Sequence, residues 1–155
     1  MKIVCIVIGK KHDSAIAAAI DDYSTRVQRY VSFEWRIVPS GKGKMNADET
    51  KRIEGAAIAA QCKDDDYIVL LDERGTQLSS NELAALLSAQ DMGNARRVVI
   101  VIGGAYGVSD EVMRHADFVW SLSKLVFPHQ LVRLIVAEQL YRANTIRRGE
   151  PYHHE

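Results

Sequence analysis

Runs of consecutive apolar residues alternate along the chain with segments in which apolar residues recur every three or four positions. Three runs, at residues 2–9, 67–72 and 97–102, are apolar on both faces, which is typical of central strands in a parallel sheet. Residues 33–38 alternate apolar and polar side chains and predict a strand with one wetter face. A short fifth strand is expected at 118–120.

The segments between these strands predict helices that begin at capping residues. Asp13 precedes a segment in which apolar side chains recur four and three apart, as on one face of a helix. The pairs Asn46 with Glu49 and Ser79 with Glu82 have the spacing of reciprocal caps at a first turn. The apolar positions of the helix after Asn46 are Ile53, Ala57, Ile58 and Ala60.

A short helix is expected from Ser109, and a long helix over residues 129–148 precedes the tail at 151–155. The order of strands and helices predicts an α/β fold, a mostly parallel sheet with helices on both faces, in a single domain over 1–155. The last helix is apolar nearly all round, and its second apolar stripe predicts a symmetric homodimer. The residues behind this prediction are Leu131, Val132, Leu134, Ile135, Val136 and Leu140.

Composition narrows the function classes. Of the 155 residues, 47% are hydrophobic and 26% are charged, as in soluble globular proteins. Twenty basic residues balance twenty acidic ones, so the basic surplus of a typical nucleic-acid-binding protein is missing. Any RNA affinity must come from local clusters of charge or from a patch formed by two subunits. The two cysteines have neither metal-binding nor disulfide spacing, and no apolar run approaches membrane-spanning length. We expect a cytoplasmic protein without a metal or a membrane segment.

Three loops are expected to meet at the carboxyl edge of the sheet, where open α/β sheets bind ligands. They are Leu71–Gly75, Gly103–Gly107 and Ser121–Phe127. Gly103 and Gly104 directly follow the strand at 97–102 and allow a sharp turn or a close approach by a ligand, although a plain glycine-rich turn would look the same. The third loop combines apolar side chains with main-chain polar groups, a mixture suited to an adenine ring. The alternative is that these side chains only fill the end of the sheet.

Other familiar sites are missing. The sequence contains no GxxxxGK[ST] phosphate loop, no GxSxG nucleophile turn and no metal-spaced histidine pair on a helix. The glycines read G-G-x-x-G after the fourth strand, in place of the G-x-G-x-x-G after the first strand that typifies dinucleotide-binding folds. Lys42, Lys44, Lys51 and Arg52 could hold phosphate groups, or could belong to a solvated loop and helix start.

The segments LDERG, IGGAYG, SLSKLVFPHQLVRLIVAEQLYRA and the closing G-x-PYHHE resemble the SPOUT (α/β-knot) methyltransferases. Within that superfamily they resemble the ribosomal RNA large subunit methyltransferase H family over essentially the whole chain. The resemblance implies S-adenosylmethionine as methyl donor, a deep trefoil knot in the carboxyl-terminal half and an obligate homodimer. It also implies methylation of N3 of a pseudouridine in large-subunit (23S-type) ribosomal RNA.

Site residues are implied by the same resemblance. The donor would lie against the first loop, the glycine loop and the third loop. The implied donor-binding residues are Leu71, Gly103, Gly104, Leu122, Ser123, Lys124, Leu125, Val126 and Phe127. His129, after Pro128, is expected to support the donor loop.

The ring N–H of pseudouridine must lose its proton, so a base or a stabilising cation is needed. Histidines titrate near neutral pH, and Glu138 and Arg142 lie four apart on one helix face. Glu138 and Arg142 could equally form an ordinary ion pair within the helix, and the tail could be frayed. Which residue takes the proton stays open. The implied catalytic residues are Glu138, Arg142, Tyr152, His153 and His154.

Arg142, Arg147, Arg148 and the tail are expected to contact RNA, with the assembled ribosome as the recognised shape. Two other hypotheses remain. One is a non-catalytic ribosome-binding or assembly module that keeps the same fold. The other is a Rossmann-like dinucleotide enzyme, which the misplaced glycines and the absence of an acidic residue closing a second strand disfavour.

Overall fold

The protein folds as alternating strands and helices in a computed structural model that describes residues 1–41 and 46–154. The strands are β1 (Lys2–Ile8), β2 (Ser32–Val38), β3 (Asp66–Gln77), β4 (Arg97–Ile102) and β5 (Phe118–Ser121). The helices are α1 (Ser14–Val27), α2 (Ala47–Gln61), α3 (Ser80–Met92), α4 (Asp110–His115) and α5 (His129–Arg147). This order confirms the α/β class expected from the sequence.

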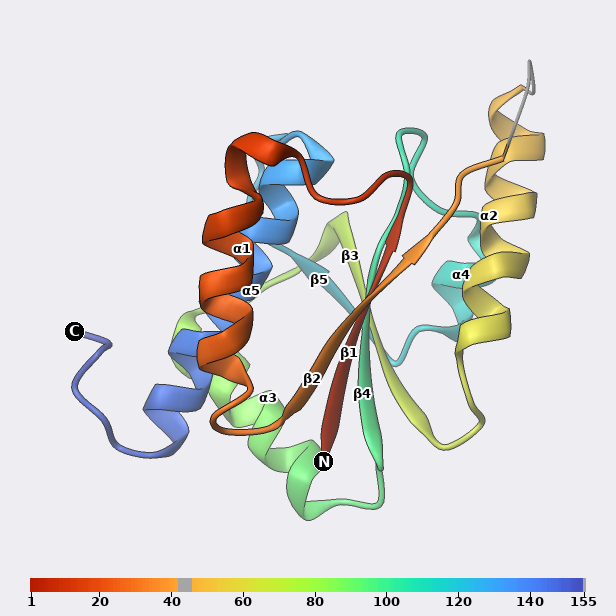
Figure 1. The fold of residues 1–155 in the computed structure, drawn as a ribbon. Coiled ribbons are helices and arrows are strands. Elements are labelled where there is room, and N and C mark those ends of the chain that lie inside the picture. The colour runs from red at the N-terminus through yellow and green to blue at the C-terminus, as the bar shows by residue number, and fades with distance from the viewer. Residues whose placement is uncertain (42–45, 155) are drawn as a thin grey trace.

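The five strands form one sheet in the order β2-β1-β4-β3-β5, and every neighbouring pair is parallel. The central strands β1 and β4 are apolar and almost wholly buried, as their continuous apolar runs predict. Helices α1, α3 and α5 cover one face of the sheet, and α2 and α4 cover the other (Figure 1). The sheet therefore separates two apolar cores.

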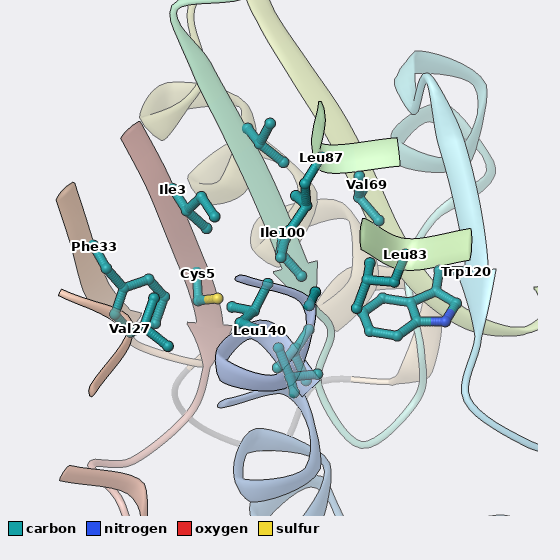
Figure 2. Close-up of a cluster of buried hydrophobic side chains, with 14 of the residues drawn as sticks. Ile3, Cys5, Val27, Phe33, Val69, Leu83, Leu87, Ile100, Trp120 and Leu140 are labelled. Carbon is teal, nitrogen blue, oxygen red and sulfur yellow. The ribbon is translucent and has the colours of Figure 1, made fainter. Parts of the chain in front are cut away.

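The larger core lies between the sheet and the layer of α1, α3 and α5. Figure 2 shows its side chains, with Cys5 and Ile100 from the central strands facing Leu140 of α5 and Leu83 and Leu87 of α3. Cys5 is fully buried, as expected for a small core residue, and burial raises the pKa of its thiol. The smaller core, which includes Val4, Val99 and Ile58, lies under α2 and α4.

Strand β3 is longer than the sequence predicts, and the extra length shapes the sheet edge. Its pairing with β5 runs to Leu71, which faces Trp120, and then resumes at Thr76, which faces the same tryptophan. Residues 72–75 leave the pairing at this irregularity, and the strand ends at Gln77. The polar sequence of 72–75 indicates a strand end, but pairing with Trp120 and Ser121 carries the strand further.

Three helix starts agree with the sequence, and one differs in its chemistry. Ser79 and Glu82 form a complete capping box, while Asn46 and Ser109 each accept a main-chain N–H with their side chains. Asp13 occupies the cap position of α1, but its side chain makes no capping hydrogen bond. Its main-chain N–H instead donates to Gln130 Oε1 of α5 at 3.0 Å, so this corner is held by tertiary contact.

The buried face of α2 differs from the apolar positions read from the sequence. Ile53 is 37% exposed and Ala60 is exposed, whereas the buried residues are Thr50, Glu54 and Ile58, four apart on one face. A carboxylate therefore lies on the inward side of this helix. Among the described residues, no helix combines the length and apolar character needed to cross a bilayer.

Candidate active site

A pocket of about 550 Å³ opens at the carboxyl edge of the sheet. Its walls come from all three loops expected to converge there, so that expectation is confirmed. The lining includes Leu71, Gly103, Gly104, Leu122, Ser123, Leu125, Val126 and Phe127, eight of the nine residues implied as donor-binding. The ninth, Lys124, is exposed and does not line the pocket.

At Gly103 and Gly104 the loop after β4 brings main chain without side chains to the pocket wall. A Cβ on Gly103 would come within 2.8 Å of Val108 Cγ1, and one on Gly104 within 2.7 Å of Glu54 Oε1. Gly107 has φ +77°, a left-handed conformation that favours glycine. Its N–H donates to the carbonyl of Gly104 at 3.0 Å and closes the turn. Close packing behind the loop therefore explains both Gly103 and Gly104.

The loop after β5 supplies unfilled apolar surface. Leu125 is 69% exposed and Val126 is 81% exposed, although both line the pocket. The loop is held by Ser121, whose hydroxyl donates to the carbonyl of Ser123, and by the Leu125 N–H, which donates to Ser123 Oγ. Apolar side chains held open on an ordered loop can cover a flat aromatic ring.

The segment after Leu71 forms a polar part of the wall. Arg74 donates to Asp72 through its main-chain N–H, through Nε at 2.9 Å and through Nη2 at 3.0 Å. These hydrogen bonds lower the pKa of Asp72, so its carboxylate is charged at neutral pH. The ion pair joins two residues within the irregularity between β3 and β5, and residues 72–74 all line the pocket.

His129 begins α5 and lines the pocket, and two buried charged groups, Arg133 and Glu54, act on it electrostatically. Burial, followed by Arg133, lowers the pKa of His129, while Glu54 acts in the opposite direction. Arg133 is 2% exposed, and its Nη1 donates to the carbonyl of Lys10 at 2.8 Å. Burial also lowers the pKa of the Arg133 guanidinium. Sequence reasoning singled out neither Arg133, although it lies within the segment SLSKLVFPHQLVRLIVAEQLYRA, nor Glu54, which stands in no motif.

Four of the five implied catalytic residues form a second cluster, on α5 and the tail. Glu138 Oε1 accepts from Arg142 Nη2 at 2.6 Å and from the Tyr152 hydroxyl at 3.0 Å. Arg142 Nη1 lies 3.2 Å from His153 Nδ1, so the tail is in polar contact with α5 at this point. Glu138 and Arg142 are thus more than an intrahelical pair. His154 is exposed.

Aromatic contacts hold the tail against the protein. The Tyr152 ring packs on Tyr141 with centroids 4.6 Å apart, and the Arg142 guanidinium lies 4.7 Å from the Tyr152 ring centroid. Tyr30 donates to Glu150 at 2.5 Å, and this bond raises the pKa of Tyr30 to about 12. Burial, followed by Tyr23 and Glu138, raises the pKa of Tyr152. The alternative of a frayed tail is therefore wrong for residues 151–153.

The pocket lies at the start of α5, whereas the tail cluster lies from the middle of α5 onward, centred on Glu138 and Arg142. Helix α5 begins beside the pocket with His129 and reaches Arg142 thirteen residues later, about 20 Å along the axis at the usual helical rise. In Figure 1 the start of α5 lies near the upper loops, and the tail follows its other end. One chain therefore does not bring these two groups of residues to one place.

The residues expected to contact RNA are divided between several surfaces. Arg147 pairs with Asp91 and Ser88, and the Arg148 guanidinium lies 5.7 Å from the Tyr30 ring centroid. Lys51 and Arg52 line a second groove of about 780 Å³ between α2 and α4, and Lys51 also lines the pocket. Lys42 and Lys44 lie outside the described residues. Over the described ranges, no group of three or more potential metal ligands is brought together.

Comparisons with known proteins agree with this arrangement. Residues 1–153 match the model of a family described as predicted SPOUT methyltransferase. The chain is 45% identical over 156 residues to the ribosomal RNA large subunit methyltransferase H of Christiangramia forsetii, covering 99% of this chain and 98% of the relative. It is 43% identical to the protein of that name from Porphyromonas gingivalis (strain ATCC 33277), over the full length of both.

Solved structures are similar in fold. A probable methyltransferase from Bordetella pertussis Tohama I superposes with a TM-score of 0.56 at 12% identity, over 92% of this chain and 95% of that one. A probable methylase family protein from Haemophilus influenzae Rd KW20 gives 0.55 at 14% identity, over 99% of this chain and 70% of that one. With the family match over nearly the whole sequence, these similarities show that the chain belongs to the SPOUT methyltransferase family.

Proposed function

We propose that the protein transfers a methyl group from S-adenosylmethionine to N3 of a pseudouridine in large-subunit ribosomal RNA, on the assembled ribosome in the cytoplasm. The observation that carries this proposal is the pocket in which the glycine loop, the segment after Leu71 and the exposed apolar loop 122–127 meet. Its relatives, named for methylation of large-subunit ribosomal RNA, supply the substrate class.

The pocket fits the donor in shape and chemistry. Leu125 and Val126 offer open apolar surface for the adenine ring, and the main chain of 103–104 and 122–127 offers donors and acceptors for polar edges. Close packing behind Gly103 and Gly104 leaves their backbone free of side chains at the wall. When bound, S-adenosylmethionine supplies an electrophilic methyl group on a positively charged sulfur.

The tail cluster has the groups needed at the pseudouridine. Arg142, charged and held by Glu138, can stabilise the anion that forms as the ring N–H loses its proton. His153, with Nδ1 toward Arg142, places an imidazole, a common acid–base group in catalysis, beside that cation. Tyr152 can stack on the base or donate a hydrogen bond. Holding the ring nitrogen in line with the methyl group supplies a further part of the rate.

A symmetric homodimer would bring the two clusters together. Leu131, Ile135, Glu138 and Arg142 share one face of α5 by their spacing. If the α5 helices of two copies pack antiparallel through this face, the tail cluster of one copy lies beside the pocket of the other.

Exposed apolar side chains support this assembly. Seven large apolar side chains are exposed in the described part of the chain, and four of them lie on the pocket wall or on α5 close to it. These four are Tyr106, Leu125, Val126 and Leu131. Together with the dimer we propose the trefoil knot that the resemblance implies for the carboxyl-terminal half.

Calorimetric titration tests the donor part of this proposal. Purified protein is titrated with S-adenosylmethionine and, in parallel, with NAD. We expect saturable binding of the first ligand and none of the second. Binding of NAD alone would favour a dinucleotide enzyme, and binding of neither would favour a module that contacts the ribosome without catalysis.

A further inference from the structure

Glu54 is a buried carboxylate beside the pocket that the proposed chemistry leaves unused. It is 3% exposed, and its Oε2 accepts from the Ser40 hydroxyl at 2.8 Å. Its Oε1 is buried and has no hydrogen-bond partner among the described residues. A buried carboxylate oxygen without a donor is costly, because water solvates it well in the unfolded chain. Such an atom requires an explanation beyond packing.

The position of Glu54 brings its charge close to the bound ligand. A Cβ on Gly104 would come within 2.7 Å of Oε1 and 2.8 Å of Oε2, so the carboxylate lies directly against the Gly104 backbone. Gly104 itself lines the pocket. Only glycine main chain therefore stands between this charge and the pocket at this point of the wall.

Glu54 also acts electrostatically on His129, which lies in the same pocket wall. His129 lines the pocket, and Glu54 opposes the effects of burial and Arg133 on its pKa. Lys51 also lines the pocket and brings a positive charge, but it lies on the half-exposed surface of α2, where water screens it. Because Glu54 is buried and Lys51 is not, solvent screens the negative charge of Glu54 less than the positive charge of Lys51.

We infer that Glu54 makes the pocket select a cationic ligand, so that the positively charged methyl donor binds more tightly than its neutral demethylated product. This inference rests on the proposed function. Donor and product share their adenosine and amino-acid parts, so contacts with those parts cannot separate them. They differ in a methyl group and in the charge on sulfur, and a fixed carboxylate in a poorly solvated wall senses that charge. Weak product binding would limit inhibition by the product.

The test compares ligands of different charge in matched variants by calorimetry. The ligands are S-adenosylmethionine, the neutral S-adenosylhomocysteine, and sinefungin, in which an amine replaces the charged sulfur. Glu54→Gln removes the charge but keeps an oxygen for Ser40, Glu54→Asp keeps the charge, and Ser40→Ala removes only the hydrogen-bond partner. Circular dichroism and thermal unfolding establish that each variant is folded.

We expect Glu54→Gln to bind S-adenosylmethionine and sinefungin about tenfold more weakly, as a unit charge acting at an effective dielectric constant near 20 allows. Its affinity for S-adenosylhomocysteine should change less than about twofold. Glu54→Asp and Ser40→Ala should keep the preference for cations.

Equal losses for all three ligands would mean that Glu54 only supports the glycine loop, and an unchanged preference would mean that its charge is not sensed. Either result would overturn the inference while leaving the methyl donor in place. Failure of the unaltered protein to bind S-adenosylmethionine would instead overturn the proposed function, and this inference with it.

Discussion

The ion pair between Asp66 and Arg97 links the start of β3 to the start of β4 with almost no exposure to solvent. Arg97 Nη2 donates to Asp66 Oδ2 at 2.6 Å, and the two side chains are 8% and 0% exposed, with the arginine first. Burial alone would raise the pKa of Asp66, but hydrogen bonds from Arg97 and Lys63 outweigh it and lower the pKa below its usual 3.8.

Replacing Asp66 by Asn should therefore destabilise the fold in a pH-dependent way. We expect a loss of about 3 kcal/mol in the free energy of unfolding at pH 7, because Arg97 remains buried without its counter-charge. Since the pKa is lowered on folding, the carboxylate contributes stability above pH 3.8, and this is lost as pH falls through 3.8 toward the folded value. Urea unfolding from pH 7 to pH 3 measures both effects.

Asp65→Asn provides the control for this measurement. Asp65 is 51% exposed, and its 3.8 Å contact is with Arg96, which is 86% exposed. Exposed pairs of this kind contribute little, so the change should be below about 0.5 kcal/mol. A loss in Asp66→Asn no larger than in Asp65→Asn would contradict the stabilising role of the buried pair.

Gly75, expected from the sequence at the end of a loop, lies in a strand and is required there for packing. It lies in β3, and a Cβ there would overlap the carbonyl group of Val119 in β5. Gly75→Ala should push β5 away from β3 and destabilise the fold by about 2–4 kcal/mol, measured by chemical unfolding. Gly93→Ala is the comparison, because its nearest neighbour would be the Ala89 carbonyl oxygen at 3.2 Å. Equal losses of stability in Gly75→Ala and Gly93→Ala would refute the packing role of Gly75.

A site residue could be predicted from the sequence only where it belongs to a recognisable pattern. Gly103 and Gly104 could be placed at the pocket because they end an apolar strand, and sheet edges of this kind bind ligands. Glu54 could not be placed beside the pocket from the sequence, because a single carboxylate in a helix rich in charged residues is expected to face water. The available signal was its spacing of four from Thr50 and Ile58, which marks one face of α2.

At the scale of elements, the strands and helices can be predicted from apolar periodicity and capping chemistry. Continuous apolar runs predicted β1 and β4, and serine caps predicted the starts of α3 and α4. The continuation of β3 to Gln77 could not be predicted, because it depends on pairing with β5, distant in the sequence. Local pattern thus predicts an element, and tertiary pairing decides where it ends.

Helix α5 carries the proposed dimer face, and Ile135 lies on it. Ile135→Asp should yield monomers in sizing chromatography with light scattering, because a charge would be buried in the apolar contact. Ile53→Asp is the control, since Ile53 is 37% exposed on α2, which covers the other face of the sheet. A dimeric Ile135→Asp protein would exclude this interface.

The tail is the element that the proposal assigns to catalysis. Deleting residues 152–155 should leave affinity for S-adenosylmethionine unchanged within about twofold, because the residues proposed to hold the donor lie in the three loops that line the pocket and not in the tail. Turnover on ribosomes should fall by about a hundredfold or more, as loss of an acid–base or charge-stabilising group predicts. Unchanged turnover would remove the tail from the mechanism.

At the scale of the whole molecule, a single chain forms the fold and the pocket, whereas the proposed reaction requires a second copy. The parallel sheet, its two helical layers and the pocket all arise from contacts within the chain. The proposed reaction also needs Arg142, thirteen residues along α5 from His129 and the pocket, and Tyr152 in the tail that follows α5. The knot could not be reached from periodicity, because ordinary connection rules disfavour threaded chains. The second apolar stripe of α5 predicts a dimer, but periodicity gives no geometry for the partner.

Methyl transfer to ribosomes is the decisive measurement for the proposed reaction. Ribosomes that lack the modification are incubated with the protein and S-adenosylmethionine labelled in its methyl group, and the RNA is digested to nucleosides. The account predicts label in large-subunit RNA, recovered as N3-methylpseudouridine, and none with the tail-deleted protein. Binding of the donor without any transfer to ribosomal RNA, or label in a different nucleoside, would contradict it.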